Sequence, residues 1–369
     1  MQTNYDFITN TLIIGGGPAG STLARKLAKK SIDTILIEKN FSFDKPCGGG
    51  IKTSVFKEFD IPIELENKRI NEFVLYSPKN KAHLDLSKTT LSIVLRKEFD
   101  EANRKIAENC GAQIIEGRYK KLKYIDDYIL VNIQTKEKLI TIKTKYLVGA
   151  DGVTSSVRKD IVGSYPKAIL THYSNIPSIS IDNCEFHFRK EFSKKDYAWL
   201  FPHGDKLSVG AALNEGKSSH KLFSNFKNKI VEKDKTQIKG FYIPLWQEET
   251  LFYKDNVFFV GDAAAQVLPF TYEGIYYAMK SAEILSHAII EDKPELYEKN
   301  WNKKYKKKFK YFKTLQKIFL SSDYMCEKMI KFFHNKRLQK SALNYWGGTA
   351  KPLSFGQAVL KVIKHSIRN

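Results

Sequence analysis

Hydrophobic and polar positions at the start of the chain follow two periods in turn. Residues 11–14 form a short apolar run of the kind that builds a buried parallel strand. Pro18 suits the first turn of a helix, and apolar residues then recur at helical spacing: Leu23, Ala24, Leu27 and Ala28. Residues 34–37 repeat the apolar run and lead into Glu38. The pattern predicts a strand, a helix and a second strand.

The same two periods continue through the middle of the chain. Helical spacing predicts one helix over residues 94–107 and another over residues 276–290. Apolar runs predict buried strands, and a polar turn between two shorter runs predicts a hairpin. The strands are expected at residues 111–115, 146–150 and 257–260, and the hairpin at residues 128–131 and 140–142.

Residues 166–246 differ, because apolar and polar residues alternate there in short segments. Examples are residues 179–181, 185–188 and 207–210. Alternation with a period of two predicts half-buried strands. We therefore expect a mostly antiparallel sheet, inserted between parts of an α/β domain.

Aromatic residues recur every three or four positions near the C-terminus, along one face of a predicted helix. They are Tyr297, Trp301, Tyr305, Phe309 and Phe312, and lysines fill the positions between them. Residues from 294 onward carry 18 Lys and Arg against 4 Asp and Glu, a net +14 of the chain's +21. One interpretation is a basic amphipathic helix that meets anionic lipid. The other, which aromatic stripes usually favour, is a helix packed on its own domain with a solvated lysine face.

Composition narrows the class of protein. A length of 369 residues and a hydrophobic content of 42% fit two or three domains with sizeable cores. The four cysteines form no CxxC pair, which is typical of reduced thiols in a cytosolic protein and not of a zinc site, so no metal is expected. We find no signal-peptide pattern and no apolar stretch long enough to span a bilayer. The lysine excess keeps an anionic membrane surface as a candidate partner, while no motif for binding nucleic acid accompanies it.

Three glycine-rich segments, far apart in the chain, together predict a binding site for one dinucleotide. They are residues 15–20 (GGGPAG), 149–152 (GADG) and 261–264 (GDAA). Gly15 allows a tight turn, Gly17 lets the backbone approach a pyrophosphate, and Gly20 lets helix and strand pack closely. The helix N-terminus offers N–H groups to the phosphates. Glu38 stands 18 residues after Gly20, close to where an acid meets the adenosine ribose. A glycine-rich turn before an ordinary helix is the alternative.

These segments give the chain a family resemblance over most of its length. It resembles the para-hydroxybenzoate-hydroxylase-like FAD proteins, on residues 15–20 with Glu38, Arg96 with Asp100, residues 149–152 with Arg158, and residues 261–262. Within them it looks most like the geranylgeranyl reductase family. The narrower evidence is residues 45–50 (KPCGGG) and residues 197–202 (YAWLFP), an aromatic Tyr-x-Trp-x-Phe-Pro stretch.

The resemblance implies the fold and a set of FAD-binding residues. The expected fold class is α/β for the FAD-binding domain and α+β for the chain as a whole. The FAD-binding domain is expected to be Rossmann-like, with an inserted, mostly antiparallel β-sheet domain and a C-terminal helical segment. Asp262 would hold the ribityl chain, Arg96 would lie near the phosphate and ribityl region, and Asp151 would shape the pocket from behind. Residues 47–50 would pass beside the flavin ring, where glycine lets the backbone approach a flat ligand. The full predicted set is Gly15, Gly17, Pro18, Ala19, Gly20, Glu38, Lys39, Cys47, Gly48, Gly49, Arg96, Asp151, Gly261, Asp262, Gly274 and Ile275.

The same resemblance suggests where substrate binds. It implies that Tyr197, Trp199, Phe201 and Pro202 line a cavity for an apolar, elongated substrate, although aromatic residues on a strand are commonly core. One departure stands out, because Tyr272 replaces the first glycine of the family's Gly-Glu-Gly-Ile run, near the flavin. Reduction of an alkene needs a proton donor, and the candidates are Cys47, Tyr272 and Tyr197. Cys47 as a small buried residue is the alternative for that position.

The expected function is an FAD-dependent oxidoreductase that reduces double bonds of a prenyl chain in a lipid or quinone. The alternatives are an FAD-dependent aromatic monooxygenase and an electron-transfer flavoprotein that serves a membrane quinone. The reductant is expected to be NAD(P)H or a protein donor, since no second dinucleotide fingerprint is present. We expect a cytoplasmic location, peripheral on the inner face of the membrane. The predicted domains are 1–75, 96–165 and 251–293 for FAD, 76–95 and 166–250 for substrate, and 294–369 as a basic helical segment.

Overall fold

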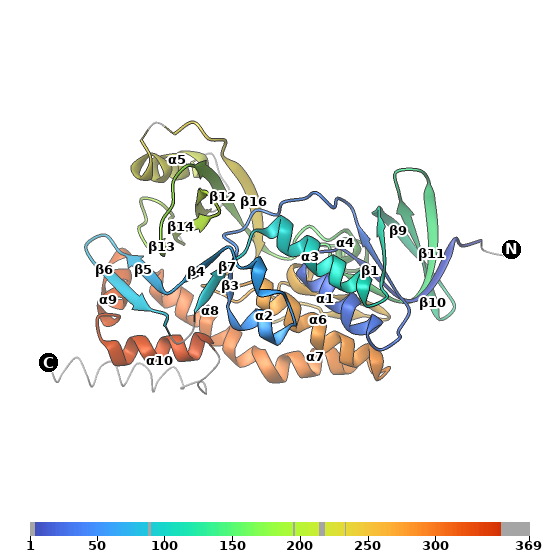
Figure 1. The fold of residues 1–369 in the computed structure, drawn as a ribbon. Coiled ribbons are helices and arrows are strands. Elements are labelled where there is room, and N and C mark those ends of the chain that lie inside the picture. The colour runs from blue at the N-terminus through green and yellow to red at the C-terminus, as the bar shows by residue number, and fades with distance from the viewer. Residues whose placement is uncertain (1–3, 88–89, 195, 214–217, 233, 348–369) are drawn as a thin grey trace. The chain divides into compact units, whose positions relative to one another are not determined.

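The computed structural model describes residues 4–87, 90–194, 196–213, 218–232 and 234–347. The chain divides into two compact units, whose helices and strands are labelled in Figure 1. The first contains Met1–Lys45, Arg96–Ala168 and Ile243–Phe309; the second contains Pro46–Leu95, Ile169–Tyr242 and the described residues from Lys310 onward. The domain limits proposed from sequence stay predictions, and the end of the predicted C-terminal segment, residues 348–369, lies outside the described residues.

The first unit is built on a largely parallel sheet with the order β17-β18-β11-β1-β2-β8. The pairs β18–β11, β11–β1, β1–β2 and β2–β8 are parallel, as the buried apolar runs predicted. The strands are β1 (Phe7–Ile14), β2 (Thr34–Glu38), β8 (Gln113–Glu116), β11 (Leu139–Gly149), β17 (Tyr253–Lys254) and β18 (Val257–Phe259). Leu12, Ile13 and Leu36 are fully buried in this sheet.

Strand β11 joins two elements that the sequence pattern separated. Residues 140–142 were expected to close a hairpin and residues 146–150 to form another strand, but one continuous strand does both. Its first half pairs antiparallel with β10 (Tyr128–Gln134), which pairs with β9 (Arg118–Ile125). Residues 142–149 pair parallel with β1, so the two pairings overlap at residues 142–144. The strand is therefore long enough to run from the hairpin into the core of the sheet.

The helices α1 (Pro18–Ala28) and α6 (Ile275–Ile290) pack against each other in the first unit (Figure 1). Lys26 of α1 and Lys280 of α6 both pair with Glu283. Burial raises the pKa of the Glu283 carboxyl, but the two ammonium groups outweigh this effect and lower the pKa to about 2. The remaining helices of this unit include α3 (Arg96–Asn109) and α4 (Ser156–Val162).

The aromatic stripe lies on a helical run that starts in the first unit. The run comprises α7 (Glu295–Trp301), the π-helical turn η3 (Asn302–Lys306) and α8 (Lys307–Phe319). Tyr297, Trp301, Tyr305 and Phe309 are all buried, so the stripe is core and the packing interpretation is confirmed. Residues four apart drift by ~40° per step in a regular α-helix. The π turn holds more residues per turn and takes up part of this drift.

The second unit is built on a seven-stranded sheet with the order β16-β12-β15-β14-β13-β5-β6. The pairs β12–β15, β15–β14, β14–β13 and β5–β6 are antiparallel, and β13–β5 is parallel. This confirms the predicted mostly antiparallel sheet. Its strands are β5 (Glu72–Tyr76), β6 (Lys81–Asp85), β12 (Ala168–Pro177), β13 (Cys184–His187), β14 (Ala198–His203), β15 (Lys206–Leu213) and β16 (Lys239–Pro244). A small sheet contains β3 (Gly50–Lys52), β7 (Leu91–Ile93) and β4 (Lys68–Ile70).

One strand expected in this sheet is absent. Residues 179–181 form no strand, because β12 ends at Pro177 and Ser178 turns the chain with a left-handed φ of 60°. Ile179 and Ile181 instead pack against a core of β14, β15 and α5 (Ser219–Ile230), which includes Leu200. Their alternation reflects two contacts made by a connection and not a strand. The unit also contains α2 (Ser54–Glu58), α9 (Asp323–Phe332) and α10 (Lys336–Gly347).

Candidate functional site

The first glycine-rich segment forms a tight turn from β1 into α1. Gly15 has a φ of 112°, and a Cβ there would lie 2.3 Å from the carbonyl oxygen of Ala150. A Cβ on Gly20 would lie 1.9 Å from the carbonyl oxygen of Gly15. Both glycines are therefore required by packing, Gly15 also by its backbone conformation. Pro18 and Ala19 complete the buried first turn of the helix.

Gly17 differs from its neighbours, because a Cβ there would meet nothing within 4 Å. It is the N-cap residue of α1, with an extended backbone, and no side chain caps the helix. A helix start without a side-chain cap leaves N–H groups for an anion, and the dipole favours negative charge. The open space over Gly17 and this helix start fit a phosphate group. The binding roles predicted for this segment stay predictions.

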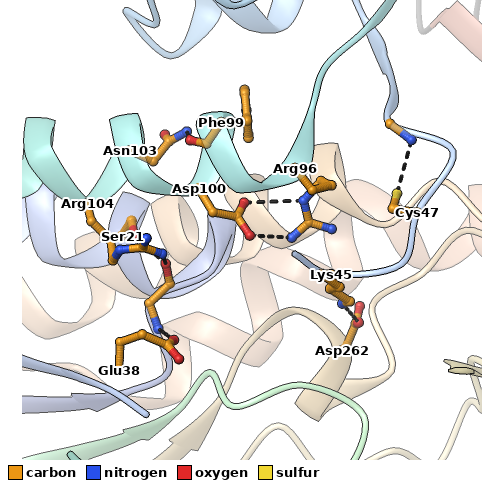
Figure 2. A network of polar contacts seen from close by, with 12 residues as sticks. Ser21, Glu38, Lys45, Cys47, Arg96, Phe99, Asp100, Asn103, Arg104 and Asp262 are labelled. Atoms are coloured by element: carbon orange, nitrogen blue, oxygen red, sulfur yellow. Dashed lines mark hydrogen bonds and ion pairs between the residues drawn. The ribbon is translucent and has the colours of Figure 1, made fainter. Parts of the chain in front are cut away.

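The carboxylate of Glu38 is held beside this turn. It accepts hydrogen bonds from the backbone N–H of Gly16 (2.7 Å) and of Asn40 (3.0 Å). Arg104 of α3 donates to the carbonyl oxygens of Gly16 (3.3 Å) and Phe41 (3.1 Å), as Figure 2 shows in part. Lys39, also predicted for this site, is exposed directly after β2. The acid is thus placed at the end of β2, next to the glycine turn.

Helix α3 buries polar side chains where an ordinary helix buries apolar ones. Arg96 donates to Asp100 through Nη2 (2.7 Å) and Nε (3.3 Å), and both side chains are buried (Figure 2). Asn103 and Arg104 are buried on the same helix. A buried charge needs a partner, and the pair Arg96–Asp100 satisfies this need without any ligand. Buried charged side chains are uncommon and are almost always paired, so this face is a candidate part of the site.

Asp151 and Arg158 hold the second glycine-rich segment in place. The Asp151 carboxylate accepts from the N–H groups of Ser156 (2.7 Å) and Val157 (3.3 Å) at the start of α4. Burial raises the pKa of Asp151 against the effect of these bonds. Arg158 donates to the carbonyl oxygens of Leu251 (2.9 Å) and Ala263 (3.1 Å), and burial lowers its pKa. Asp151 therefore caps a helix, while Arg158 ties this segment to the third one.

The third segment begins at η2 (Gly261–Ala264), directly after β18. Gly261 has a φ of 62°, and a Cβ there would lie 3.1 Å from the Cβ of Ala278 and 3.2 Å from that of Ala19. It therefore sits where α1 and α6 approach each other. The Asp262 carboxylate pairs with Lys45, whose Nζ lies 2.5 Å from Oδ2, and both side chains are partly buried (Figure 2).

The loop between η2 and α6 is conformationally unusual. Ala265, Phe270 and Tyr272 have left-handed φ values of 51°, 71° and 52°. Such backbone favours glycine, and a non-glycine residue there costs about 1–2 kcal/mol. Tyr272 thus occupies, at a cost, the position where the resembling family has glycine. Gly274 is the N-cap of α6 without a side-chain cap, and a Cβ there would lie 3.7 Å from Oδ1 of Asp262; Ile275 follows, buried.

The second unit places residues 47–50 at the start of its small sheet. The Gly49 N–H donates to Sγ of Cys47 (3.3 Å), shown in Figure 2, and Val94 N–H donates to the Gly49 carbonyl (2.9 Å). Gly49 has a φ of 73°, and a Cβ there would lie 2.2 Å from the Val94 carbonyl oxygen. A Cβ on Gly48 would lie 2.3 Å from the ring of Phe201. These glycines are therefore explained by packing within the unit.

The predicted pocket residues divide between the two faces of β14. Trp199 and Phe201 are half-buried and share one face, while Pro202 is buried on the other with Leu200. Tyr197 precedes the strand by one residue and its ring lies 6.3 Å from that of Trp199. Burial, with a smaller effect of Asp196, raises the pKa of Tyr197 well above its ordinary value. The structure thus groups Tyr197, Trp199 and Phe201 and separates Pro202 from them.

Sequence reasoning missed two polar residues of the first unit. Lys45 was noticed only as part of a motif, and its ion pair with Asp262 joins residues 217 positions apart. Arg104 carried no motif, although its spacing from Arg96 and Asp100 on one helical face was a usable signal. In the described part of the chain no group of His, Cys, Asp and Glu could hold a metal ion. None of its helices is long and apolar enough to cross a membrane.

Comparison with known proteins places this geometry in context. The model of the FAD binding domain family matches residues 8–251. The chain is 31% identical over 365 residues to a chloroplastic geranylgeranyl diphosphate reductase of Arabidopsis thaliana, which covers 89% of this chain and 78% of that protein. It is 28% identical to a digeranylgeranylglycerophospholipid reductase of Methanocaldococcus jannaschii, over 84% of this chain and 88% of that protein.

Solved structures share the fold. A geranylgeranyl bacteriochlorophyll reductase-like protein of Thermoplasma acidophilum superposes with a TM-score of 0.80 at 21% identity, over 89% of this chain and 91% of that one. A flavin-dependent brominase superposes with a TM-score of 0.75 at 16% identity, over 98% and 99% of the two chains. Because one fold serves reduction and halogenation, the fold alone does not decide the reaction.

Proposed function

The chain belongs to the geranylgeranyl reductase family of FAD-dependent oxidoreductases, and on that premise we propose that it reduces carbon–carbon double bonds in the prenyl chain of a lipid or quinone. The observation that carries the proposal is similarity over 89% of the chain to a reductase named for a geranylgeranyl substrate. That span is too long to reflect the FAD-binding segments alone. A prenyl chain is the substrate class that the two named relatives have in common.

The first unit supplies the residues proposed to hold FAD. The open backbone at Gly17 and the uncapped start of α1 suit the pyrophosphate, and Glu38 is placed for the adenosine ribose. Asp262 is proposed to accept hydrogen bonds from the ribityl hydroxyls, with Lys45 holding one of its oxygens. Arg96 is fixed by Asp100 and brings positive charge to the same unit. Asp151 acts one step away, because its carboxylate caps α4.

FAD, when bound, supplies the hydride, and the protein must supply a proton and exclude water. Tyr197 is the least suited of the three candidate donors, because its raised pKa means that it holds its proton tightly. Cys47 has its sulfur fixed by the Gly49 N–H. Tyr272 is held in a costly backbone conformation, which marks it for a functional role. We propose Cys47 and Tyr272 as the residues to test for proton transfer.

An apolar face of the second unit is proposed to receive the prenyl chain. Tyr197, Trp199 and Phe201 share one face of the strand region, and Phe186 of β13 lies against it, 5.5 Å from Phe201 between ring centroids. Aromatic side chains of this kind line pockets for apolar ligands. Pro202 is left out of this proposal, because it points to the opposite face.

A lipid-borne substrate suggests that the protein works at an anionic membrane surface. The buried aromatic stripe cannot insert into lipid, so docking must be electrostatic. Lys303, Lys304 and Lys307 are exposed on the same helical run, and a lysine near an anionic surface contributes about 1 kcal/mol. We expect reversible binding to anionic liposomes that weakens as salt screens the charges.

Co-sedimentation with liposomes of varied anionic content tests this docking. The variant with Lys303, Lys304 and Lys307 changed to Glu should lose most of its binding at low salt. The matched control changes three exposed lysines of β9 to Glu, namely Lys120, Lys121 and Lys123, and should bind like the parent. Equal losses in both variants, or equal binding of the parent to neutral liposomes, would remove the proposed surface.

Mass spectrometry of lipid extracts tests the proposed reaction. Cells with the protein should hold prenyl lipids or quinones heavier by two hydrogens per double bond than cells without it. The reductant, NAD(P)H or a protein donor, is identified by which of them bleaches the flavin. Oxygen-dependent use of NADPH with a hydroxylated aromatic product would instead indicate a monooxygenase. Electron delivery to a quinone with no saturated product would indicate an electron-transfer flavoprotein.

A further inference from the structure

The three glycines after Cys47 contact protein on two sides, and the middle one, Gly49, is buried. The ring of Phe201 covers one side, since a Cβ on Gly48 would lie 2.3 Å from its Cδ2 and one on Gly50 would lie 3.4 Å from its Cε2. The backbone of Val94 covers the other, since a Cβ on Gly49 would lie 2.2 Å from its carbonyl oxygen. Real Cβ atoms essentially never lie within 3.0 Å of a neighbour, so the distances of 2.3 Å at Gly48 and 2.2 Å at Gly49 exclude a side chain unless something shifts. The run is therefore clamped between an aromatic ring and a neighbouring strand segment.

Further contacts hold both sides of the clamp. Val94 donates its N–H to the Gly49 carbonyl at 2.9 Å, and Gly50 pairs with Ile93 in the small sheet. Phe201 is held by edge-to-face packing on Phe186, at 5.5 Å between centroids, and Phe186 packs in the same way on Phe73 at 5.3 Å. Aromatic pairs of this geometry contribute beyond the area that they bury.

This clamp fixes the sulfur of Cys47. The Gly49 N–H that donates to Sγ belongs to the middle residue of the clamped run (Figure 2). A shift of Gly48 or Gly49 would therefore move the donor and release the thiol. We propose that Phe201 is a positioning residue, which sets the place of Cys47 through the backbone of Gly48. Its meaning for turnover rests on the proposed function, but the packing role itself does not.

Trp199 offers a matched comparison on the same strand and the same face. Its ring lies over Gly210 of β15, where a Cβ would come within 2.2 Å of it, and not over the run after Cys47. Phe201 and Trp199 thus make the same kind of aromatic–glycine contact with different targets. Loss of either ring removes similar packing, but only loss of Phe201 is expected to free the Cys47 segment.

Hydrogen exchange of the FAD-bound protein is the first test. In Phe201→Leu, peptides that cover residues 45–53 should exchange about two- to tenfold faster, the range that follows from losing one aromatic contact. In Trp199→Leu these peptides should exchange at the parent rate. Equal acceleration in both variants, or none in Phe201→Leu, would overturn the proposal. Neither outcome depends on which substrate the enzyme uses.

A compensating pair of changes gives the second test. Gly48 does not have a left-handed backbone, so Gly48→Ala should act mainly through its clash with Phe201. Gly48→Ala should speed hydrogen exchange at residues 45–53, and adding Phe201→Leu to the same chain should partly reverse this effect. Such a reversal is expected because the effects of changes at two residues in contact are not additive. Trp199→Leu should give no such rescue. If Gly48→Ala instead weakens FAD binding at unchanged exchange, and Phe201→Leu does not rescue it, the glycine serves the flavin and the proposal is wrong.

Steady-state kinetics on a prenyl substrate separate the two roles of Phe201 once turnover is available. A positioning residue should lower kcat in Phe201→Leu with KM little changed, and Phe201→Tyr, which keeps the ring, should restore it. A residue that binds the prenyl chain should raise KM instead. Failure of the proposed reaction would leave the exchange results standing, so the two failures are distinguishable.

Discussion

Two glycines of the first segment should respond in opposite ways to added side chains, although they lie three residues apart. We expect Gly17→Leu to fold normally and to lose FAD, because a Cβ there meets nothing within 4 Å and the backbone φ of −77° is open to any residue. A larger side chain would occupy the space proposed for the pyrophosphate. We expect Gly20→Ala to damage the fold itself, because its Cβ would lie 1.9 Å from a backbone oxygen that cannot move aside.

The magnitudes separate the two cases. Replacing glycine at a helix N-cap by an apolar residue costs up to about 1 kcal/mol of unfolding free energy. Overpacking of the kind expected at Gly20 costs about 1–3 kcal/mol or more. FAD at 100 times its dissociation constant should add about 2.7 kcal/mol to the stability of the parent protein. It should add nothing to Gly17→Leu.

Chemical denaturation of the apo-proteins, with and without added FAD, measures both effects. Gly17→Leu should unfold near the parent midpoint without FAD and should not shift when FAD is added. The reasoning is refuted if FAD stabilises Gly17→Leu as much as the parent. It is also refuted if apo Gly17→Leu is destabilised as much as apo Gly20→Ala.

Three further changes probe the first unit. Asp262→Ala should weaken FAD binding by about 1–3 kcal/mol, measured by titration into apo-protein, and an unchanged affinity would mean that this acid does not bind the ribityl chain. Tyr272→Gly should raise the unfolding free energy of the apo-protein by about 1 kcal/mol, because it relieves a left-handed backbone; a loss of stability would show that contacts of the tyrosine outweigh the strain. Glu283 has its pKa lowered to about 2 from 4.5, so its ion pairs stabilise the fold above about pH 4.5 and are lost as pH falls toward about 2. The stability difference between the parent and Glu283→Gln should therefore shrink over that range, and a constant difference would contradict the assignment.

The parts of the fold that follow local periodicity were predictable from sequence. The unit of β1, α1 and β2 and the helix α6 appear as expected, because each buries one continuous apolar run or face. The strand predicted at residues 179–181 is absent. Two isoleucines with one residue between them give the alternating pattern of a strand, but they lie on a connection and both contact a core. The division of β11 was wrong for the opposite reason: one continuous strand pairs antiparallel with β10 over residues 139–144 and parallel with β1 over residues 142–149.

Contacts between residues far apart in the chain are the part of the site that could not be predicted from sequence. The bond from Lys45 to Asp262 and the contact of Phe201 with Gly48 join positions far apart in the chain, and no local pattern announces either. The sequence drew attention to Tyr272 as a departure from the family, but not to its left-handed backbone. The sequence predicts that the glycines after Cys47 lie beside a flat ligand, and this stays a prediction. Their contacts with Phe201 and Val94 inside the second unit could not be predicted from a local pattern.

Reduction of a defined prenyl substrate by the purified protein tests the central claim most directly. The FAD-loaded enzyme would be reduced under anaerobic conditions and mixed in heavy water with geranylgeranyl diphosphate or a geranylgeranyl glycerophospholipid. The masses of the products would then be measured by mass spectrometry. We predict a gain of two hydrogens for each saturated bond, at least one of them deuterium, because the proton comes from a group that exchanges with solvent. Flavin that stays reduced in the presence of both substrates, with no saturated product, would contradict the account.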